Sequence, residues 1–420
     1  MIVWLLQRNE PTPHDDGGGQ RVFRTGIMAQ MLSDAGHEVV WWTSDFDHYN
    51  RRHRYNGNHS KSTITGYDIQ YLKSRGYRKN ISYDRIAANK EVALSFAKIA
   101  RQYSNIPDVI IASIPTAELA WQGIKYGKKH GIPVLLDVRD LWPDHIVDLA
   151  PIWAKPLVKL GIWPLSRLTS KVFKQATGVF GLTESFLDWG LSYAMRERNR
   201  YDRVVPMGYV KNGSVDSDKQ DQDKQFWKKQ GISEHSGYLI SSFIGTIGYS
   251  SDLDLVIDAA KRLKAENKKV KLVICGDGEL ACLLHEKARG LDNVIFPGWI
   301  NKGQIDSLLL CSDIGLLPYI QSENYIKNLP NKPAEYLSQG LLLASSLPKG
   351  PLFSLINEFD CGFSYSGSAE LLAEELGFYS EHPEQLKIKK ENALSAFNQK
   401  LNGDKIYRGM VEYLQDIVKK

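Results

Sequence analysis

The stretch YLISSFIGTIGYSSDLDLVIDAAKRLKAEN, Tyr238–Asn267, points to the fold class of this chain. Its first residues are a short apolar run, which is typical of a buried strand, and a loop with two glycines follows. The second half repeats apolar residues at helical spacing, which places one set of side chains on a single face. These residues are Leu253, Ile257, Ala260 and Leu263. A strand, a tight loop and an amphipathic helix in this order predict one unit of a parallel α/β sheet.

The same alternation fills the rest of the chain. Apolar runs predict strands at IVWLLQ, HEVVWWT, DVIIAS and PVLLDV, and later at VKLVICGDGE, VIFPGW, IGLLPY and LLLASS. Helices are predicted at Ala117–His130 and before Gly36, the latter with an apolar face of Val22, Phe23, Ile27, Met31 and Leu32. The polar stretch KNGSVDSDKQDQDKQ, residues 211–225, is predicted to be a linker or an exposed loop. The pattern therefore predicts two Rossmann-like halves with a boundary near Val204–Asp223.

Composition narrows the class of protein. With 420 residues, 43% apolar and 24% charged, the chain has the composition of a soluble protein of two domains. A net charge of +5 is too mild to predict a nucleic-acid partner. The four cysteines form no CxxC pair, which favours a reducing, cytoplasmic compartment. No run of about 18 apolar residues predicts a membrane span, and MIVWLLQRNE is typical of a strand rather than a signal peptide.

Glycine-rich loops follow the first strand of each half. DDGGGQ, Asp15–Gln20, and GTIGYSSD, Gly245–Asp252, would let the backbone approach a phosphate beside a helix N-terminus. His14, Asp15 and Asp16 could contact a sugar, but a solvated loop explains them about as well. Plain turn chemistry also explains either loop alone, so the matched positions of the two loops carry the argument.

Two further motifs are weighed and set aside. GDGELA, Gly276–Ala281, has the spacing of a dinucleotide fingerprint, but the next strand, VIFPGW, ends without the acid that would hold a ribose. A nicotinamide site is therefore rejected. DFD, Asp45–Asp47, could hold a divalent cation, but an acidic loop is the preferred interpretation. No metal site is predicted.

DVRDLWPD, Asp137–Asp144, ends a predicted strand, where ligands of parallel sheets bind. Arg139 and Asp140 are expected to face a ligand cleft, and Trp142 offers a flat face for a sugar ring. The alternative is a structural Arg–Asp pair with a packed tryptophan.

KNLPNKPAEYLSQG, Lys327–Gly340, is a loop that opens into a helix with Glu335 expected in its first turn. A carboxylate there can accept hydrogen bonds from the two hydroxyls of a ribose. Lys327 and Lys332 would neutralise a diphosphate, and the loop from Asn328 to Asn331 could present backbone N–H groups. The alternative for Glu335 is an acid placed there by the helix dipole.

LPNKPAEYLSQGLLLASS resembles the C-terminal signature of retaining GT-B glycosyltransferases of family 4, and DLWP, GDGEL and FPGW stand in the order of that family. RDLWP and PNK are also found in bacterial surface-polysaccharide enzymes of the fucosamine-transferase type. The resemblance implies an α/β GT-B fold, with two Rossmann-like parallel-sheet domains that face each other across a cleft. Residues 1–205, with a final helix within 405–420, would form the acceptor domain, and residues 206–404 the nucleotide-sugar domain.

The resemblance also implies roles for individual residues. Glu335 would bind the ribose, Gly18 and Gly19 would approach the diphosphate from the first domain, and Gly245 with Thr246 from the second. The backbone at Trp299 and Ile300 would meet the base. Many relatives have a glutamate where Lys327 stands and a histidine where Arg139 stands, so this chain departs from the family at both positions.

The resemblance implies a reaction without a metal or a cofactor. The acceptor hydroxyl would attack on the face from which UDP leaves, while Lys327 and Lys332 stabilise the departing diphosphate. Arg139 and Asp140 are further candidates for catalysis. The further candidates for substrate binding are Asn331, Trp142 and His14. The expected reaction moves an N-acetylated or deoxy amino sugar from a UDP-sugar to a lipid-linked saccharide of O-antigen, capsule or exopolysaccharide synthesis. The alternatives are a non-hydrolysing UDP-sugar 2-epimerase and an inactive nucleotide-sugar-binding protein.

The segment Ala150–Thr183 contains five Lys or Arg residues and no acid, interleaved with tryptophan and leucine. This pattern suits the surface of an anionic bilayer. The alternative is a core helix with a solvated basic face, which the two internal prolines would break into short pieces. An acceptor linked to undecaprenyl diphosphate, which the resemblance implies, favours membrane contact. The expected location is therefore the cytoplasmic face of the inner membrane.

Overall fold

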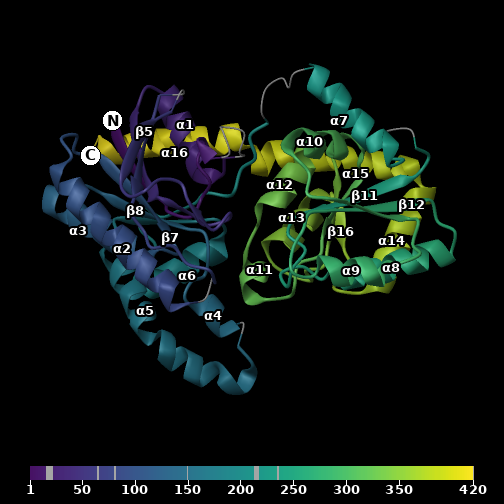
Figure 1. Ribbon diagram of the computed structural model, residues 1–420, viewed down its shortest axis with the longest axis horizontal. Helices are drawn as coiled ribbons and strands as arrows, with labels where there is room; N and C mark the ends of the chain where they lie inside the picture. Colours follow the sequence, from purple (N-terminus) through teal and green to yellow (C-terminus); the bar gives the residue numbers. More distant parts are fainter. Residues whose placement is uncertain are drawn as a thin grey trace. The chain divides into compact units, whose positions relative to one another are not determined.

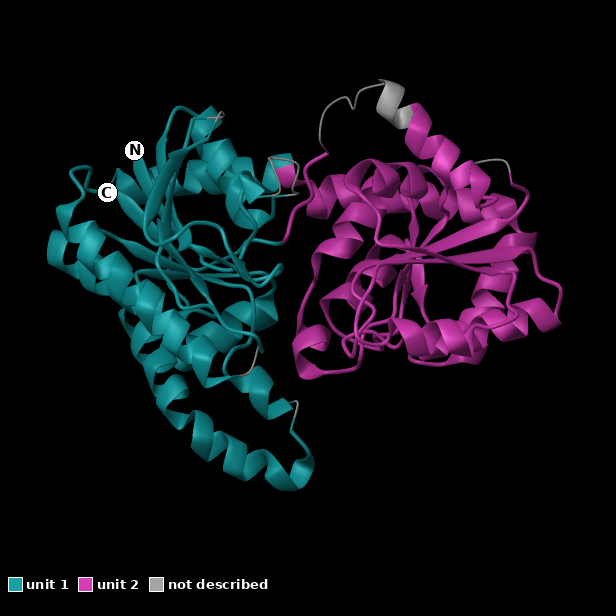
Figure 2. Cartoon of the chain, in the orientation of Figure 1, with its two compact units in different colours: residues 1–206, 404–420 teal, residues 207–403 magenta. Residues whose placement is uncertain are grey.

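The computed structural model describes residues 1–15, 22–63, 66–79, 82–148, 150–211, 217–233 and 236–419, and for residues 217–220 it describes the backbone alone. The chain divides into two compact units (Figure 2). Unit 1 comprises Met1–Pro206 and Asp404–Lys420, and unit 2 comprises Met207–Gly403.

Unit 1 is built on an eight-stranded sheet (Figure 1). Its strands are β1 (Ile2–Leu6), β2 (Glu38–Ser44), β5 (His59–Ser62), β6 (Asp68–Leu72), β7 (Val109–Ile114), β8 (Val134–Val138), β9 (Gly178–Gly181) and β10 (Arg203–Val204). The strand order is β10-β9-β8-β7-β1-β2-β6-β5, and all pairs are parallel except that of the edge strand β5 with β6. A short antiparallel ribbon of β3 (Phe46–Asp47) and β4 (Arg52–His53) stands apart from this sheet.

Helices cover the sheet of unit 1. They are α1 (Arg24–Asp34), α2 (Tyr83–Ile99), α3 (Ala117–His130), α4 (Asp144–Asp148), α5 (Lys155–Gln175), α6 (Glu184–Ala194) and α16 (Gly403–Val418), with the 3-10 turns η2 (Ala100–Gln102) and η3 (Ile152–Ala154). The strands β7 and β8 are buried along their whole length, as continuous apolar runs in a two-sided sheet should be.

The predicted apolar face of α1 is wrong. Phe23 precedes the helix as its N-cap, and Ile27 and Met31 are only half-buried. The buried residues of the helix are Arg24, Thr25, Gly26, Met28, Ala29 and Leu32. The helix is turned because Arg24 is paired with an acid inside the unit, a contact that hydrophobic periodicity does not reveal.

The last helix, α16, belongs to unit 1. Its Tyr407 ring lies 5.7 Å from the guanidinium of Arg24, and Tyr413 stacks under Arg203 at 3.8 Å. Near its end, the side chain of Gln415 bonds to His37. These contacts tie residues separated by most of the chain length into one unit.

Unit 2 is built on a six-stranded, all-parallel sheet of order β13-β12-β11-β14-β15-β16. Its strands are β11 (Leu239–Ile244), β12 (Val270–Cys275), β13 (Val294–Gly298), β14 (Ile314–Leu317), β15 (Leu342–Ser345) and β16 (Gly362–Ser364). Its helices are α7 (Ser217–Lys229), α8 (Leu253–Ala265), α9 (Ala281–Lys287), α10 (Lys302–Cys311), α11 (Glu323–Lys327), α12 (Asn331–Ser338), α13 (Pro351–Phe359), α14 (Ala369–Glu381), α15 (Pro383–Ala396) and the π turn η4 (Phe397–Leu401).

The predicted linker of unit 2 is largely helical. Helix α7 begins at Ser217, inside the stretch that was predicted to be a loop. It is held at its far end by Trp227, which is fully buried and donates a hydrogen bond to the carbonyl of Gln304. The prediction is wrong because the stretch has no apolar residues at helical spacing, although its Lys and Gln residues are good helix formers, and the aromatic side chain that anchors the helix lies beyond it.

The prolines of the basic segment do not break it. Helix α5 runs without interruption over 21 residues, with Pro156 in its first turn and Pro164 inside it. Pro156 does not disturb the helix, because the backbone N–H groups of the first turn have no hydrogen-bond partner within the helix. Only the second half of α5 contributes substantially to the core, through Thr169, Val172 and Phe173. No helix in the described part of the chain is long and apolar enough to cross a membrane.

Candidate functional site

A pocket of about 280 Å³ opens in unit 2 where β11 and β12 end. Its lining residues are Ile244, Gly245, Thr246, Cys275, Gly276, Asp277, Trp299, Ile300 and Ile305. The parallel sheet thus brings together four residues that were predicted to bind the nucleotide, Gly245, Thr246, Trp299 and Ile300. Ile300 is buried, whereas the ring of Trp299 is 78% exposed and available to stack on a planar ligand.

Lys332 lies directly over Gly245. A Cβ atom added to Gly245 would stand 2.8 Å from Nζ of Lys332 and 2.9 Å from its Cε, closer than real contacts allow. The same ammonium lies 5.5 Å from the ring centre of Phe243. The glycine therefore lets a lysine from α12 reach the loop after β11, and one cation is placed beside the pocket.

Tyr336 holds α12 against the end of β11. Its ring is fully buried, and its phenol oxygen accepts a hydrogen bond of 3.2 Å from the backbone N–H of Ile244. Gly315 on β14 leaves room for this ring, since a Cβ there would lie 2.1 Å from Cδ2 of Tyr336. Burial, and then the charge of Glu335, raises the pKa of Tyr336, so the phenol stays neutral. The position of Lys332, one turn earlier, is fixed by this anchor.

The prediction that Glu335 lies in the first turn of its helix is wrong. Helix α12 starts at Asn331, and Glu335 follows one full turn later, with only 5% of its surface exposed. The helix dipole acts over the first turn, so it does not explain a carboxylate at this depth. Asn331 lies four residues before Glu335 and is half-buried at the helix start. The role of Glu335 as a ligand of the ribose stays a prediction.

Lys327 occupies a different environment. It ends α11, is 41% exposed, and forms an ion pair of 3.0 Å with Glu323 one turn earlier. Part of its charge is therefore already compensated. The structure places Lys332, but not Lys327, over the glycine loop.

The two glycines of GDGELA serve a contact between loops. Gly276 has φ +132°, and a Cβ there would lie 1.8 Å from the carbonyl oxygen of Gly245. Gly278, with φ +157°, packs in the same way against the carbonyl of Ile247, at 2.4 Å. Side chains at either position would push the loop after β12 away from the loop after β11. The fingerprint spacing arises from this packing, which shapes the wall of the pocket.

At the corresponding ends of the strands in unit 1, Arg139 is held in a buried ion-pair network. Asp137, fully buried on β8, binds Nε of Arg24 at 3.0 Å and Arg139 at 2.7 Å, and Arg139 also pairs with Glu10. Burial alone would raise the pKa of Asp137, but Arg139 and Arg24 bring it below its usual value. The side chain of Arg139 is 8% exposed, so the structure shows the structural Arg–Asp pair that was the alternative.

Asp140 and Trp142 follow in the same loop. One carboxylate oxygen of Asp140 is buried and has no hydrogen-bond partner among the described residues. Burial raises the pKa of Asp140, against the opposing charges of His145 and Arg85. Trp142 is half-buried, with the guanidinium of Arg85 5.0 Å from its ring centre. The predicted sugar platform is therefore occupied on one side by an arginine.

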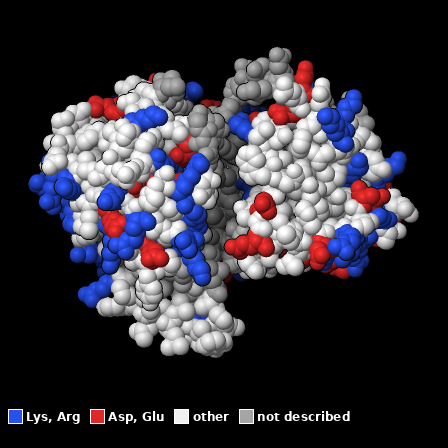
Figure 3. Space-filling view, in the orientation of Figure 1, with Lys and Arg blue, Asp and Glu red and all other residues white. Residues whose placement is uncertain are grey.

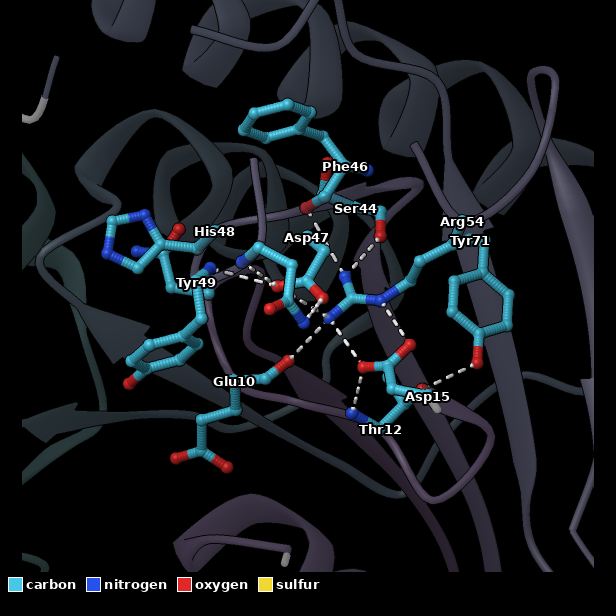
Figure 4. Close-up of polar contacts among 12 residues, drawn as sticks. Glu10, Thr12, Asp15, Ser44, Phe46, Asp47, His48, Tyr49, Arg54 and Tyr71 are labelled. Carbon is cyan, nitrogen blue, oxygen red and sulfur yellow. Dashed lines mark hydrogen bonds and ion pairs between the residues drawn. The ribbon is translucent and has the colours of Figure 1, made fainter. Parts of the chain in front are cut away.

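Arg54 holds the loop that leads to the first glycine stretch (Figure 4). It forms two hydrogen bonds to Asp15, of 2.7 and 2.8 Å, and donates to the backbone carbonyls of Ser44, Phe46 and Glu10. His14, next to Asp15, is half-buried, and its pKa is lowered by burial and by Lys61. Asp16, Gly18 and Gly19 lie outside the described residues, so their predicted roles stay predictions.

The acids of the DFD motif are buried rather than exposed. Asp47 accepts hydrogen bonds from the backbone N–H groups of Tyr49 and Asn50 and from the amide of Asn50. Asp45 lies 3.4 Å from the ring of His53. In the described part of the chain, no group of three or more His, Cys, Asp and Glu residues is placed to hold a metal ion.

The interpretation of the sequence missed Glu10, Arg24 and Arg54. Each is buried, although arginine and glutamate are rarely buried without a partner. Their partners are remote in sequence, 113 residues away for Arg24 and Asp137. The only local signal was the position of Glu10 just after a strand.

Comparison with solved structures identifies the fold of this chain. HepE from Anabaena, solved with UDP and glucose, has a TM-score of 0.66 at 12% identity, over 99% of this chain and 100% of that one. Sucrose-phosphate synthase from Thermosynechococcus elongatus gives 0.72 at 14% identity, over 99% and 98%. WaaG, a glycosyltransferase involved in lipopolysaccharide biosynthesis, gives 0.65 at 15% identity, over 99% of each chain. Two Rossmann-like parallel-sheet units of this kind define the GT-B fold.

A family model matches a part of unit 2. Residues 223–396 match the family model described as glycosyl transferases group 1. The matched residues include the lining of the pocket, Lys332 and Glu335. No curated protein matches the chain.

Proposed function

We propose that this chain is a retaining glycosyltransferase that transfers a sugar from a UDP-sugar to a lipid-linked saccharide at a membrane surface. The donor sugar we propose is an N-acetylated or deoxy amino sugar, on the strength of RDLWP and PNK alone. The likeness to HepE, which was solved with UDP and glucose bound, supports a uridine nucleotide.

One observation carries the proposal: the ammonium of Lys332 lies over the α-carbon of Gly245 beside the pocket of Trp299 and Ile300. A nucleotide whose base lies in that pocket would present its diphosphate to this ammonium and to the N-terminus of α12. Glu335, one turn further into the same helix, would then accept the hydroxyls of the ribose. The pocket, Lys332 and Glu335 would thus bind the base, the diphosphate and the ribose of a nucleoside diphosphate, respectively.

The proposed chemistry is the stabilisation of a leaving group. When the bond between the anomeric carbon and the diphosphate breaks, the electron pair and the negative charge go to UDP. The ammonium of Lys332 beside the pocket and the N–H groups at the start of α12 would oppose that charge. The oxygen of the acceptor hydroxyl forms the new bond on the face that UDP leaves, which retains the configuration, and the hydroxyl proton passes to the departing diphosphate. Lys332 is the residue we propose for this role, with Lys327, paired to Glu323, as an outer contributor.

Nucleotide binding tests the role of Glu335. Wild type is expected to bind UDP at least about 10-fold more tightly than 2′-deoxy-UDP, because charge-assisted hydrogen bonds contribute about 1.5–3 kcal/mol. Glu335→Gln and Glu335→Ala should lose this preference, and Glu323→Gln, an acid 50% exposed on α11, serves as control. Equal preference for UDP in wild type and in Glu335→Ala would remove the ribose role.

Turnover separates the transferase from its alternatives. With a UDP-sugar alone, a transferase releases UDP slowly, and a detergent-solubilised lipid-diphosphate saccharide accelerates the release. A changed sugar still attached to UDP would identify a 2-epimerase. UDP binding without turnover across a panel of donors would identify a binding protein.

The proposed membrane contact rests on the first half of α5 and the turn before it. Large apolar side chains are exposed there: Ile152 (86%), Trp153 (78%), Leu157 (66%), Leu160 (74%) and Trp163 (56%). The part of unit 1 that extends furthest down in Figure 3 is almost free of charged atoms, and it is where α5 projects in Figure 1. Such a patch on a soluble domain marks an interaction site. Lys155 and Lys159 beside it favour an anionic bilayer.

Liposome flotation tests this contact. Wild type should float with phosphatidylglycerol vesicles, and Leu157→Asp with Leu160→Asp should not, because each buried leucine contributes about 1.5–3 kcal/mol. Leu94→Asp, which changes a leucine 63% exposed on α2 of the same unit, is the matched control. Neutralising Lys155, Lys159 and Lys171 should weaken flotation further on anionic than on zwitterionic vesicles. Flotation of the double variant to the wild-type extent would exclude α5 as the contact.

A further inference from the structure

Unit 1 contains a second pocket, of about 340 Å³, at the base of the exposed part of α5. Its lining residues are Ser82, Tyr83, Arg85, Ile86, Asn89, Trp142, Ile146, Gly161, Ile162 and Leu165. They come from α2, from the loop after β8, from α4 and from α5. The volume lies in the range of small-molecule sites, and the nucleotide site in unit 2 shares none of these residues.

Arg85 is the one charged residue among the described residues that line this pocket, and two more arginines lie with it around the ring of Tyr77. The guanidinium groups of Arg8, Arg51 and Arg85 lie 5.4, 5.1 and 5.9 Å from the ring centre of Tyr77. Arg8 is almost completely buried and donates to Asn89, a residue of the pocket wall. Nε of Arg8 is buried without a hydrogen-bond partner among the described residues.

The charges around Arg85 favour the binding of an anion. Burial, followed by Arg85, Arg51 and Arg8, lowers the pKa of His48 to about 3. Arg8 interacts with Asp45 and Glu118, and Arg85 interacts with Asp140; burial raises the pKa of each of these acids. A bound phosphate would supply negative charge where the neighbouring carboxyls resist ionisation.

The lining that α4 and α5 contribute is apolar, and the exposed part of α5 is next to it along the helix. Ile146 faces it from α4, and Gly161, Ile162 and Leu165 line it from α5. Leu157 and Leu160, which carry the proposed membrane contact, lie within one turn of Gly161 on the same helix. An aliphatic chain could therefore pass from the pocket onto an apolar surface.

We propose that this pocket binds the phosphate-proximal part of an isoprenyl phosphate, with the phosphate at Arg85 and the chain against Trp142, Ile146, Ile162 and Leu165. The proposal rests on the proposed function, because the isoprenyl chain is that of the lipid-linked acceptor. It adds where the lipid is held: on α2, α4 and α5 of unit 1, with the chain directed along α5 toward the bilayer.

Gly161 offers a variant that fills the pocket while preserving the fold. A Cβ added at Gly161 meets no atom within 4 Å, so a larger side chain is accommodated without a clash. Gly409 on α16 has equally open surroundings and is exposed, which makes Gly409→Leu a matched control in another helix. Both substitutions also replace a helical glycine by a better helix former.

The test is binding of farnesyl diphosphate by calorimetry, with UDP saturating so that the diphosphate site of unit 2 is occupied. Wild type and Gly409→Leu should bind farnesyl diphosphate, and Gly161→Leu should bind it at least 10-fold more weakly. Arg85→Gln should lose at least 10-fold for farnesyl diphosphate but less than 3-fold for farnesol. Inorganic pyrophosphate should bind much more weakly than farnesyl diphosphate, because it lacks the chain.

The outcomes separate this proposal from the proposed function. If UDP binds and sugar transfer occurs, but wild type and Gly161→Leu bind farnesyl diphosphate equally, the pocket is not the lipid site and the transferase stands. Equal binding of pyrophosphate and farnesyl diphosphate would reduce the site to a phosphate site and overturn the proposal. If no UDP-sugar is turned over, the proposed function fails, whatever the farnesyl diphosphate result.

Discussion

Replacing Gly245 by alanine should weaken diphosphate binding while leaving the fold intact. The new methyl group would lie 2.8 Å from Nζ and 2.9 Å from Cε of Lys332, and 3.2 Å from the ring of Phe243. The atoms it meets first are the end of a flexible lysine, so the lysine swings away and the backbone keeps its path. The loss of unfolding free energy should therefore stay below about 1 kcal/mol, in the range of ordinary substitutions.

The effect on binding follows from the displaced ammonium. A hydrogen bond to a charged group contributes about 1.5–3 kcal/mol, and each 1.4 kcal/mol is tenfold in affinity. UDP should bind roughly 10- to 150-fold more weakly to Gly245→Ala. Uridine, which has no phosphate, should bind within about 2-fold of wild type. Lys332→Met should show the same pattern, because it removes the same charge.

Calorimetric titration with UDP and with uridine measures both quantities. Gly248→Ala is the matched control, since a Cβ in that same loop meets only Thr246, at an ordinary 3.7 Å. UDP affinity in Gly245→Ala equal to that in Gly248→Ala would refute the placement of Lys332 at the diphosphate. A loss in Gly245→Ala without a loss in Lys332→Met would show that the methyl group, and not the displaced charge, is responsible.

Two further predictions concern unit 1. Asp137→Asn should lower the unfolding free energy of unit 1 by about 3–5 kcal/mol, because it leaves Arg24 and Arg139 buried without their carboxylate. Urea unfolding measures this loss. A loss no larger than that of Asp258→Asn, which changes an acid whose ion pairs are partly exposed on α8, would contradict the prediction. The Asp137 pKa lies below its usual 3.8, so its stabilisation is present above pH 3.8 and is lost as the pH falls further. His48→Gln should flatten the fall in stability between pH 6.5 and about 3 by up to about 1.4 kcal/mol per pH unit, because the unfolded histidine takes up a proton that the folded one, with a pKa of about 3, refuses. Parallel pH profiles of wild type and variant would exclude His48 as the cause.

Local sequence patterns were enough to predict most of the helices and strands. The predicted helix Ala117–His130 has the bounds of α3, and the predicted apolar face of α8 is buried. These predictions succeed because continuous apolar runs and helical spacing report burial directly. They fail where one remote contact decides: Trp227 makes a helix of a polar stretch, and Arg24 turns the face of α1.

The order of residues was enough to predict the succession of strands, glycine loops and helices, and with it the edge of each sheet where ligands bind. Apolar periodicity and glycine are local properties, so this much is written in neighbouring residues. The folded chain was needed to show that Lys332 reaches Gly245, that Glu335 is buried a turn inside its helix, and that Arg139 is bound by Asp137 and Glu10. These contacts join separate elements, and the packing of helices on the sheet, which sets their distances, is a property of the whole unit rather than of any stretch.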